Sequence, residues 1–231
     1  MMTNNTENET ITPYQEGDKW GYRNSEEKVV ITPKYDEVKP FVEGIARVKL
    51  NGKWGLIDIN GKEITPLKYD EAGFFSEGLT AVRLDSKWGY VNEAGAELVL
   101  LKYNEVWPFC EGFAGVELDG KWGFIDKTGE EVIPLIYDSV WFFSEGLVAI
   151  ELDGKWGYID ENGSEIIPFK YDNGYSFSDG LAEVNLDGTT CYIDKTGREF
   201  LDTDREAKKI VMYFVGKGRD LFQQKTNHYP N

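Results

Sequence analysis

The dipeptide Trp-Gly recurs every 34 residues along this chain, and this repeat constrains the possible folds more than any other feature. Its tryptophans are Trp20, Trp54, Trp88, Trp122 and Trp156, and Thr190-Cys191 occupies the sixth place in the same register. A fixed period of this length is typical of arrays in which each repeat is one supersecondary unit. The sequence therefore predicts an all-β chain of six repeats over residues 13–201, with the first and last degenerate.

Each repeat contains signals for three β-strands joined by tight turns. Residues 45–50 (IARVKL) are rich in β-formers and are followed by Asn51-Gly52, a strong hairpin signal. The second strand is KWGLID, and Asn60-Gly61 then turns the chain into KEITP. Pro66 is expected to end that third strand, because proline cannot donate to a ladder. The predicted unit is a three-stranded antiparallel meander.

The stretch that connects one meander to the next reads YDEVKPFVEG in its first copy and is expected to form a structured loop. Its last residue, Gly44, recurs in the later copies. Glycine is favoured where the backbone needs a positive φ or a close approach. We therefore expect one of these two requirements at this position.

Three short strands cannot bury their apolar face alone, so neighbouring repeats are expected to stack. We predict an open superhelical, solenoid-like array, with a closed six-bladed β-propeller as the alternative. Thr203-Asp204-Arg205-Glu206 fits a helix capping box, so residues 202–231 are predicted to form a C-terminal capping helix and tail. Residues 1–12 are polar and are predicted to form a mobile N-terminal tail.

Several motifs recur together in each unit: Lys-Trp-Gly, Asp-x-Asn-Gly, a proline and Tyr-Asp, as in KWGLIDINGKEITPLKYD and KWGYIDENGSEIIPFKYD. In this combination the chain resembles the bacterial WG-repeat family, also called KWG repeats, over residues 14–200. The resemblance implies a β-strand repeat without a common enzymatic activity and with function mostly unassigned. Thr190-Cys191 departs from the pattern, which indicates a degenerate terminal repeat.

The charge balance restricts the partners of the chain. Forty-one acidic and twenty-five basic residues give a net charge of −16, which repels nucleic acid and anionic membranes and favours neutral or basic partners. The lysines that precede the repeat tryptophans are expected to form a solvated stripe balanced by acids. The N-terminus has neither a basic nor an apolar export segment, so we expect a cytoplasmic protein.

No residue stands out as a catalytic group. The single histidine, His228, lies in the C-terminal tail with nothing in sequence to pair with it. Cys110 occupies a position held by valine or serine in other copies, and Cys191 replaces a repeat glycine, so neither is expected to be a nucleophile or part of a disulfide. A dyad of either cysteine with His228 is the one nucleophilic alternative. We expect no enzymatic activity and no cofactor.

The turns that begin at Asp58, Asp126 and Asp160 resemble calcium loops only in their first residues. Glycine follows at position 4, whereas an EF-hand loop has glycine at position 6 and a bidentate glutamate at position 12. An aspartate that opens a tight turn accepts backbone N–H groups, which is sufficient reason for its recurrence. The sequence therefore predicts structural turns and no metal site.

Two sets of aromatic positions have different meanings. The tryptophans of the Trp-Gly dipeptide occur in every full repeat and are interpreted as a buried structural spine. A second column is variable, because it reads Lys39, Gly73, Trp107, Trp141 and Tyr175 in successive copies. Aromatic residues that the repeat does not require are candidates for partner contacts, and filling of gaps between repeats is the alternative explanation.

The leading functional hypothesis is a non-enzymatic repeat scaffold that binds a protein partner through Trp107, Trp141 and Tyr175. One alternative is a glycan- or cell-wall-binding module, because stacked aromatic rings suit sugar faces. Another is an acidic antagonist of a basic toxin, of the immunity-protein type, which the charge of −16 motivates.

Overall fold

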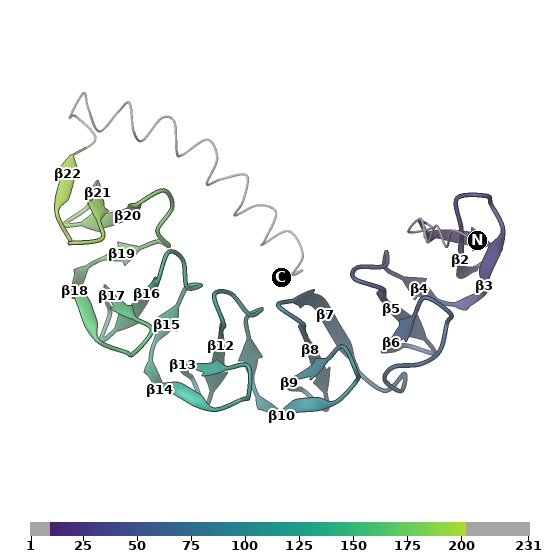
Figure 1. The fold of residues 1–231 in the computed structure, drawn as a ribbon. Coiled ribbons are helices and arrows are strands. Elements are labelled where there is room, and N and C mark those ends of the chain that lie inside the picture. Colours follow the sequence, from purple (N-terminus) through teal and green to yellow (C-terminus); the bar gives the residue numbers. More distant parts are fainter. Residues whose placement is uncertain (1–9, 202–231) are drawn as a thin grey trace, which may run out of the picture. The chain divides into compact units, whose positions relative to one another are not determined.

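The computed structural model describes residues 10–201, which form β-strands and turns and contain no helix. Their strands form small antiparallel sheets, none of which closes into a barrel (Figure 1). The described residues belong to two compact units. The first comprises the residues up to Phe109 together with Lys127–Gly129, and the second comprises Cys110–Asp126 and the residues from Glu130 on.

The sheets of the first unit have the strand orders β1-β2-β3, β4-β5-β6 and β10-β9-β8-β7. The strands are β1 (Thr12–Glu16), β2 (Lys19–Arg23), β3 (Val29–Tyr35), β4 (Glu37–Val38), β5 (Ile45–Leu50), β6 (Lys53–Asp58), β7 (Glu71–Ser76), β8 (Leu79–Leu84), β9 (Lys87–Asn92), β10 (Glu97–Tyr103) and β11 (Glu105–Val106). Neighbours in each sheet are consecutive in the chain, which is the predicted meander.

The second unit has the same local order, with β12-β13-β14, β15-β16-β17-β18 and β19-β20-β21-β22 as runs of hydrogen-bonded neighbours. The strands are β12 (Phe113–Leu118), β13 (Lys121–Asp126), β14 (Glu131–Tyr137), β15 (Ser139–Val140), β16 (Leu147–Leu152), β17 (Lys155–Asp160), β18 (Glu165–Tyr171), β19 (Asn173–Gly174), β20 (Leu181–Leu186), β21 (Thr189–Asp194) and β22 (Glu199–Leu201). The 34-residue period of the sequence is thus a period of secondary structure.

The connecting stretch is not wholly a loop, and this corrects the three-stranded prediction. It contains the short strands β4, β15 and β19, which pair with β5, β16 and β20. In the first copy Glu37 pairs with Lys49 and Val38 pairs with Val48. Two residues are too short to leave a period-2 signal in the sequence. The sheets therefore have three or four strands.

The prediction that proline ends the third strand was also wrong. Pro134 and Pro168, in the same column as Pro66, lie inside β14 and β18. Both strands are at a sheet edge and pair with their neighbours through register shifts, so the missing N–H interrupts no regular ladder. In the repeat of Pro66 the third strand is reduced to isolated bridges, and the buried Thr65 hydroxyl accepts the N–H of Leu56 at 3.0 Å.

The tight turns have the backbone that their sequences indicate. Asn51 and Gly52 have φ values of 53° and 79°, as a type I′ hairpin requires. The glycine of the connecting stretch also adopts the expected positive φ, with 82° at Gly44, and Glu43 before it has 51°. A second two-residue turn therefore joins the bridged residues Val42 and Ile45.

The glycine of the Trp-Gly dipeptide is required by close packing rather than by its φ. A Cβ added at Gly89 would lie 2.4 Å from the Val99 carbonyl oxygen, and one at Gly123 would lie 2.5 Å from that of Ile133. The outer strand bends over this position at its register shift. In the last repeat, β22 pairs with β21 without such a shift, opposite Cys191, which explains why a side chain is accepted there.

The repeat tryptophans contribute to the core to different degrees. Trp54, Trp88 and Trp156 each retain 8% exposure, whereas Trp20 and Trp122 are half-buried. Trp156 belongs to a cluster that spans two consecutive sheets and includes Tyr158, Phe177, Val184 and Ile193. The spine interpretation therefore holds most strongly at the three buried tryptophans.

The predicted segments at both chain ends extend beyond residues 10–201. The predicted capping helix and tail, 202–231, lie outside the described residues. The predicted N-terminal tail, 1–12, overlaps them at its end, where Ile11 packs against a core cluster and Thr12 begins β1. An open array or a closed propeller is a question of how the units are placed, and the open array stays a prediction.

Candidate binding surface

In three copies the backbone at the variable aromatic column is held by a hydrogen bond to the neighbouring strand. Its N–H groups donate to carbonyl groups of the neighbouring strand. The pairs are Lys39 with Arg47 at 2.9 Å, Trp141 with Ala149 at 2.9 Å and Tyr175 with Glu183 at 3.0 Å. The side chains of this column are therefore presented from equivalent backbone positions.

A buried tyrosine hydroxyl provides a second anchor for this column. The donors and accepting carbonyls are Tyr22 with Lys39 at 2.7 Å, Tyr90 with Trp107 at 2.6 Å and Tyr158 with Tyr175 at 2.8 Å. Burial raises the pKa of Tyr158 well above its ordinary value, so this hydroxyl remains a donor at neutral pH. Because the anchor uses the carbonyl, lysine, tryptophan and tyrosine are all accepted at the column.

Trp141 and Tyr175 contact one another in the second unit. Their ring centroids are 5.8 Å apart with an interplanar angle of 38°. Trp141 is half-buried and packs against the cluster that contains Trp156, whereas Tyr175 retains 37% exposure. The structure thus brings together two of the three predicted contact residues as one aromatic patch. The third, Trp107, is half-buried in the first unit.

The surroundings of the column change in the last repeat. In the first unit the Lys39 ammonium lies 5.8 Å from the centre of the Trp54 ring, fifteen residues along the chain. Fifteen residues after Tyr175 the column of repeat tryptophans holds Thr190, whose hydroxyl donates to Asn185 at 2.8 Å. The degenerate repeat thus replaces a large indole by a small polar side chain, and the tyrosine of this copy is exposed.

A polar side chain adjoins the exposed ring. The Asn173 Nδ2 group lies 3.3 Å from the Tyr175 hydroxyl, and the Asn173 Oδ1 atom accepts the N–H of Gly174 at 2.8 Å. Sequence reasoning missed Asn173, since its column reads Glu37, Glu71, Glu105 and Ser139 in the earlier copies, which are ordinary residues of a solvated surface. We define the aromatic patch as Trp141, Tyr175 and Asn173.

The repeated lysines are tied to the Tyr-Asp motif, so they are not free cations. Lys121 Nζ lies 2.5 Å from Asp138, whose other carboxylate oxygen accepts the N–H of Asp153 at 2.8 Å. The lysine donor holds the pKa of Asp138 below its ordinary value. The equivalent pairs are Lys19–Asp36, Lys53–Asp70 and Lys155–Asp172. Each aspartate thus joins the Trp-Gly strand of its repeat to the next hairpin.

Cys110 has a structural role. Its thiol lies 3.3 Å from the Phe143 carbonyl oxygen, in the same relation in which Ser144 Oγ donates to the Phe177 carbonyl at 2.7 Å. Serine and cysteine in this column therefore join one repeat to the next. Burial raises the pKa of the Cys191 thiol, which disfavours the thiolate. His228, the partner in the dyad alternative, lies outside the described residues.

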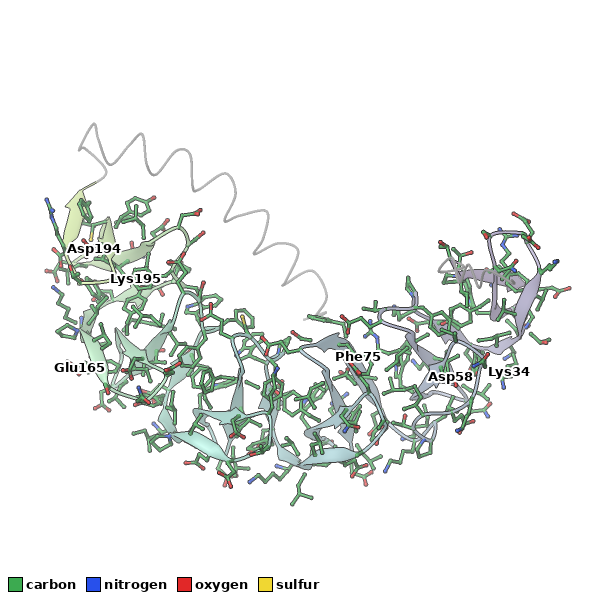
Figure 2. The ribbon with its side chains drawn as sticks, in the orientation of Figure 1. Lys34, Asp58, Phe75, Glu165, Asp194 and Lys195 are labelled. Atoms are coloured by element: carbon green, nitrogen blue, oxygen red, sulfur yellow. The ribbon has the colours of Figure 1, made fainter. Side chains whose placement is uncertain are left out.

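The aspartates that open the turns accept backbone N–H groups, as predicted. Asp58 Oδ1 accepts the N–H groups of Asn60 and Lys62, both at 2.9 Å. Figure 2 labels Asp58 and Asp194, which begin two of these turns at the ends of β6 and β21. Within residues 10–201, no group of three His, Cys, Asp or Glu side chains could hold a metal ion.

Comparison with known protein families identifies the same repeat. A family model described as the WG containing repeat matches residues 20–54, 54–88, 88–122, 122–156 and 156–189. The chain belongs to the WG-repeat family. No curated protein matches it. Each WG match begins at a repeat tryptophan, so the family pattern and the structural period coincide.

Solved structures show a likeness of fold. A crystal structure of a eukaryotic initiation factor aligns with a TM-score of 0.52 at 14% identity, over 85% of this chain and 63% of that one. The Kluyveromyces lactis Hsv2p structure aligns with a TM-score of 0.46 at 13% identity, over 85% of this chain and 73% of that one. These neighbours are β-propeller-like repeat proteins. The described WG repeats include no helix able to cross a membrane.

Proposed function

We propose that this WG-repeat protein is a non-enzymatic scaffold that binds a protein partner through the aromatic patch. The contact between Trp141 and Tyr175 carries the proposal, because both rings stand on backbone positions that the fold fixes without using the side chain. Such rings can change between repeats without altering the hydrogen bonds beneath them. Trp107 offers a ring of the same kind in the first unit.

The surrounding chemistry supports binding over catalysis. Four of the repeated lysines are paired with aspartates and Lys87 donates to Asn104. The turn aspartates accept backbone N–H groups, and the Cys110 thiol contacts a carbonyl. An aromatic ring with a neighbouring amide is a typical centre of a protein contact, since it combines a large apolar area with a hydrogen-bonding group. The net charge of −16 favours a neutral or basic partner. We place this binding activity in the cytoplasm.

Glycan binding is the second candidate function. The exposed ring of Tyr175 beside the Asn173 amide offers an apolar face and a hydrogen-bonding group for a sugar. The acidic antagonist of a basic toxin is a special case of protein binding, and the charge of the chain supports it.

The proposal is tested by affinity capture with the full chain, followed by mass spectrometry and by binding measurements with each captured protein. The test variant is Trp141→Ala/Tyr175→Ala, and the matched control is Ile136→Ala, which removes an exposed aliphatic side chain from β14 of the same unit. We expect the double variant to bind the partner about tenfold or more weakly and the control to bind it normally. Equal binding by all three proteins would refute the patch as the contact. Retention on a glycan array that the double variant loses would favour the sugar alternative.

A further inference from the structure

The outer strand of the repeats is a sheet edge, and most copies protect it. The strands β3, β10, β14 and β18 each have seven residues, lie at the end of their sheet and share one burial pattern (Figure 1). An exposed edge strand is a template for pairing with another chain. Proline blocks such pairing because it has no N–H to donate. Three of these strands contain one: Pro33, Pro134 and Pro168.

The strand β10 is the exception among the seven-residue strands of the described residues, because it contains no proline. Leu100 occupies the column that holds Pro134 and Pro168. Those prolines are accepted with the same pattern of buried and exposed residues. The N–H of residue 100 is therefore not needed for the sheet. Among β10, β14 and β18 it is present in β10 alone, whereas in β3 the equivalent residue is Thr32 and Pro33 follows it.

Leu100 also distinguishes β10 from the edges that contain proline, where the most exposed aliphatic side chains are Val29 at 55% and Ile136 at 49%. Leu100 is 72% exposed, and Leu98, on the same face, is 45% exposed. The neighbouring turn packs on the opposite face, where a Cβ at Gly129 would lie 3.1 Å from Val99. The outward face of β10 thus combines bare aliphatic side chains with an unblocked backbone.

We propose that β10 pairs antiparallel with β10 of a second copy of this chain. An antiparallel pair of identical strands closes on itself about a two-fold axis. In the register that places Leu100 on the axis, Leu100 of one copy lies opposite Leu100 of the other. Leu98 of one copy then lies opposite the aliphatic part of the Lys102 side chain of the other. These pairs keep outward-facing residues on one face of the joined sheet, as strand alternation requires.

The local charge selects a second copy as the occupant. The whole chain carries −16, but β10 carries one acid and one base, Glu97 and Lys102, so its own charges cancel. Glu97 is further paired with Lys68 at 2.8 Å. Two such edges meet without like-charge contact. The remaining charge of the two chains repels at longer range, and salt screens this repulsion. The dimer is therefore expected to strengthen as ionic strength rises.

Sedimentation velocity of the full chain over a range of concentrations, at low and high salt, tests the proposal. The wild-type chain is expected to form a dimer whose fraction rises with concentration and with salt. Leu100→Pro copies the residue of three other repeats, Pro66, Pro134 and Pro168, so it should retain the fold and weaken the dimer by about tenfold or more through the lost donor. A second variant, Leu98→Lys/Leu100→Lys, keeps the backbone and charges the edge, and it should also be monomeric.

The matched control is Ile166→Lys, which charges an exposed position on the proline-protected strand β18 and should leave the dimer unchanged. A wild-type chain that stays monomeric at all concentrations and salts overturns the proposal. So does a dimer that both β10 variants preserve, because it must then use another surface. The partner-capture variants lie in the second unit, so failure of this inference leaves the proposed function standing.

Discussion

The shared column of repeat tryptophans and the variable column differ in how the fold uses them. In the shared column, Trp54, Trp88 and Trp156 are buried to 8% exposure, and the fold needs their rings. In the variable column, a tyrosine hydroxyl holds the backbone carbonyl, and Tyr175 leaves 37% of its surface exposed. One repeat can therefore separate its structural positions from positions that are free to specify a contact.

The largest expected effect belongs to the shared column. Trp88→Ala should destabilise the protein by about 3–5 kcal/mol, because it removes a buried ring and leaves a cavity. Trp122→Ala should destabilise the protein clearly less than Trp88→Ala, since the Trp122 ring is half-buried. Chemical denaturation of both variants measures the difference. Equal losses of unfolding free energy would show that the burial of a repeat tryptophan does not determine how much it stabilises the fold.

Substitution of the glycine in the Trp-Gly dipeptide should destabilise the protein almost as much. Gly89→Ala is expected to cost about 3 kcal/mol, because the new Cβ would meet the Val99 carbonyl oxygen at 2.4 Å. The control is Gly120→Ala, where nothing lies within 4 Å and the cost is only that of a positive φ, about 1 kcal/mol. Urea unfolding measures the loss of unfolding free energy in both variants. Equal losses for Gly89→Ala and Gly120→Ala would show that close packing is not the reason for glycine at position 89.

One copy departs from a shared turn, and restoring the shared residue should stabilise the chain. Ser86 has a φ of 64° where the equivalent residues are Gly52, Gly120, Gly154 and Gly188. Ser86→Gly should raise the unfolding free energy by about 1 kcal/mol, because glycine adopts this conformation without strain. The reverse change, Gly154→Ser, should lower it by a similar amount. A loss of stability in Ser86→Gly would contradict the turn assignment.

The shared aspartates predict the response to acid. Lysine donors lower the pKa values of Asp36, Asp70, Asp138 and Asp172 in the folded chain. A carboxyl with a lowered folded pKa contributes stability above its unfolded pKa and loses it as pH falls through the folded value. Thermal melts should therefore be nearly constant from about pH 7 to 5 and fall below about pH 4.

The third repeat supplies the control for this acid response. It carries Asn104 at the aspartate position, and Lys87 donates to it at 3.2 Å. Asp138→Asn should accordingly reduce the loss of Tm on acidification. A Tm that stays constant down to about pH 2 would exclude these aspartates as contributors to stability.

Local turn chemistry could be predicted from the sequence because each turn is decided by neighbouring residues. Asn51-Gly52 and the turn at Asp58 have the backbone and hydrogen bonds that their residues indicate. The aromatic patch could be predicted in part, since Trp141 and Tyr175 are brought into contact. That these positions bind a partner stays a prediction.

The missed features depend on how one strand approaches another. Pro134 lies inside a strand because a register shift removes the need for its N–H, and a single sequence does not reveal a register shift. The need for Gly89 comes from a carbonyl oxygen of the next strand. The β4 strand is fixed by pairing with β5 and has only two residues of its own. These contacts are set by packing, and the local sequence carries little of their signal.

The most direct test of the separation between the two columns compares Trp156→Ala with Tyr175→Ala by chemical denaturation in the same unit. Trp156→Ala should lose about 3–5 kcal/mol, and Tyr175→Ala should lose less than about 1 kcal/mol, because its ring is exposed and its backbone anchor remains. Trp141→Ala should fall between them, since Trp141 is half-buried. Equal losses for Trp156→Ala and Tyr175→Ala would show that the variable column is part of the core, and the proposed binding surface would then be wrong.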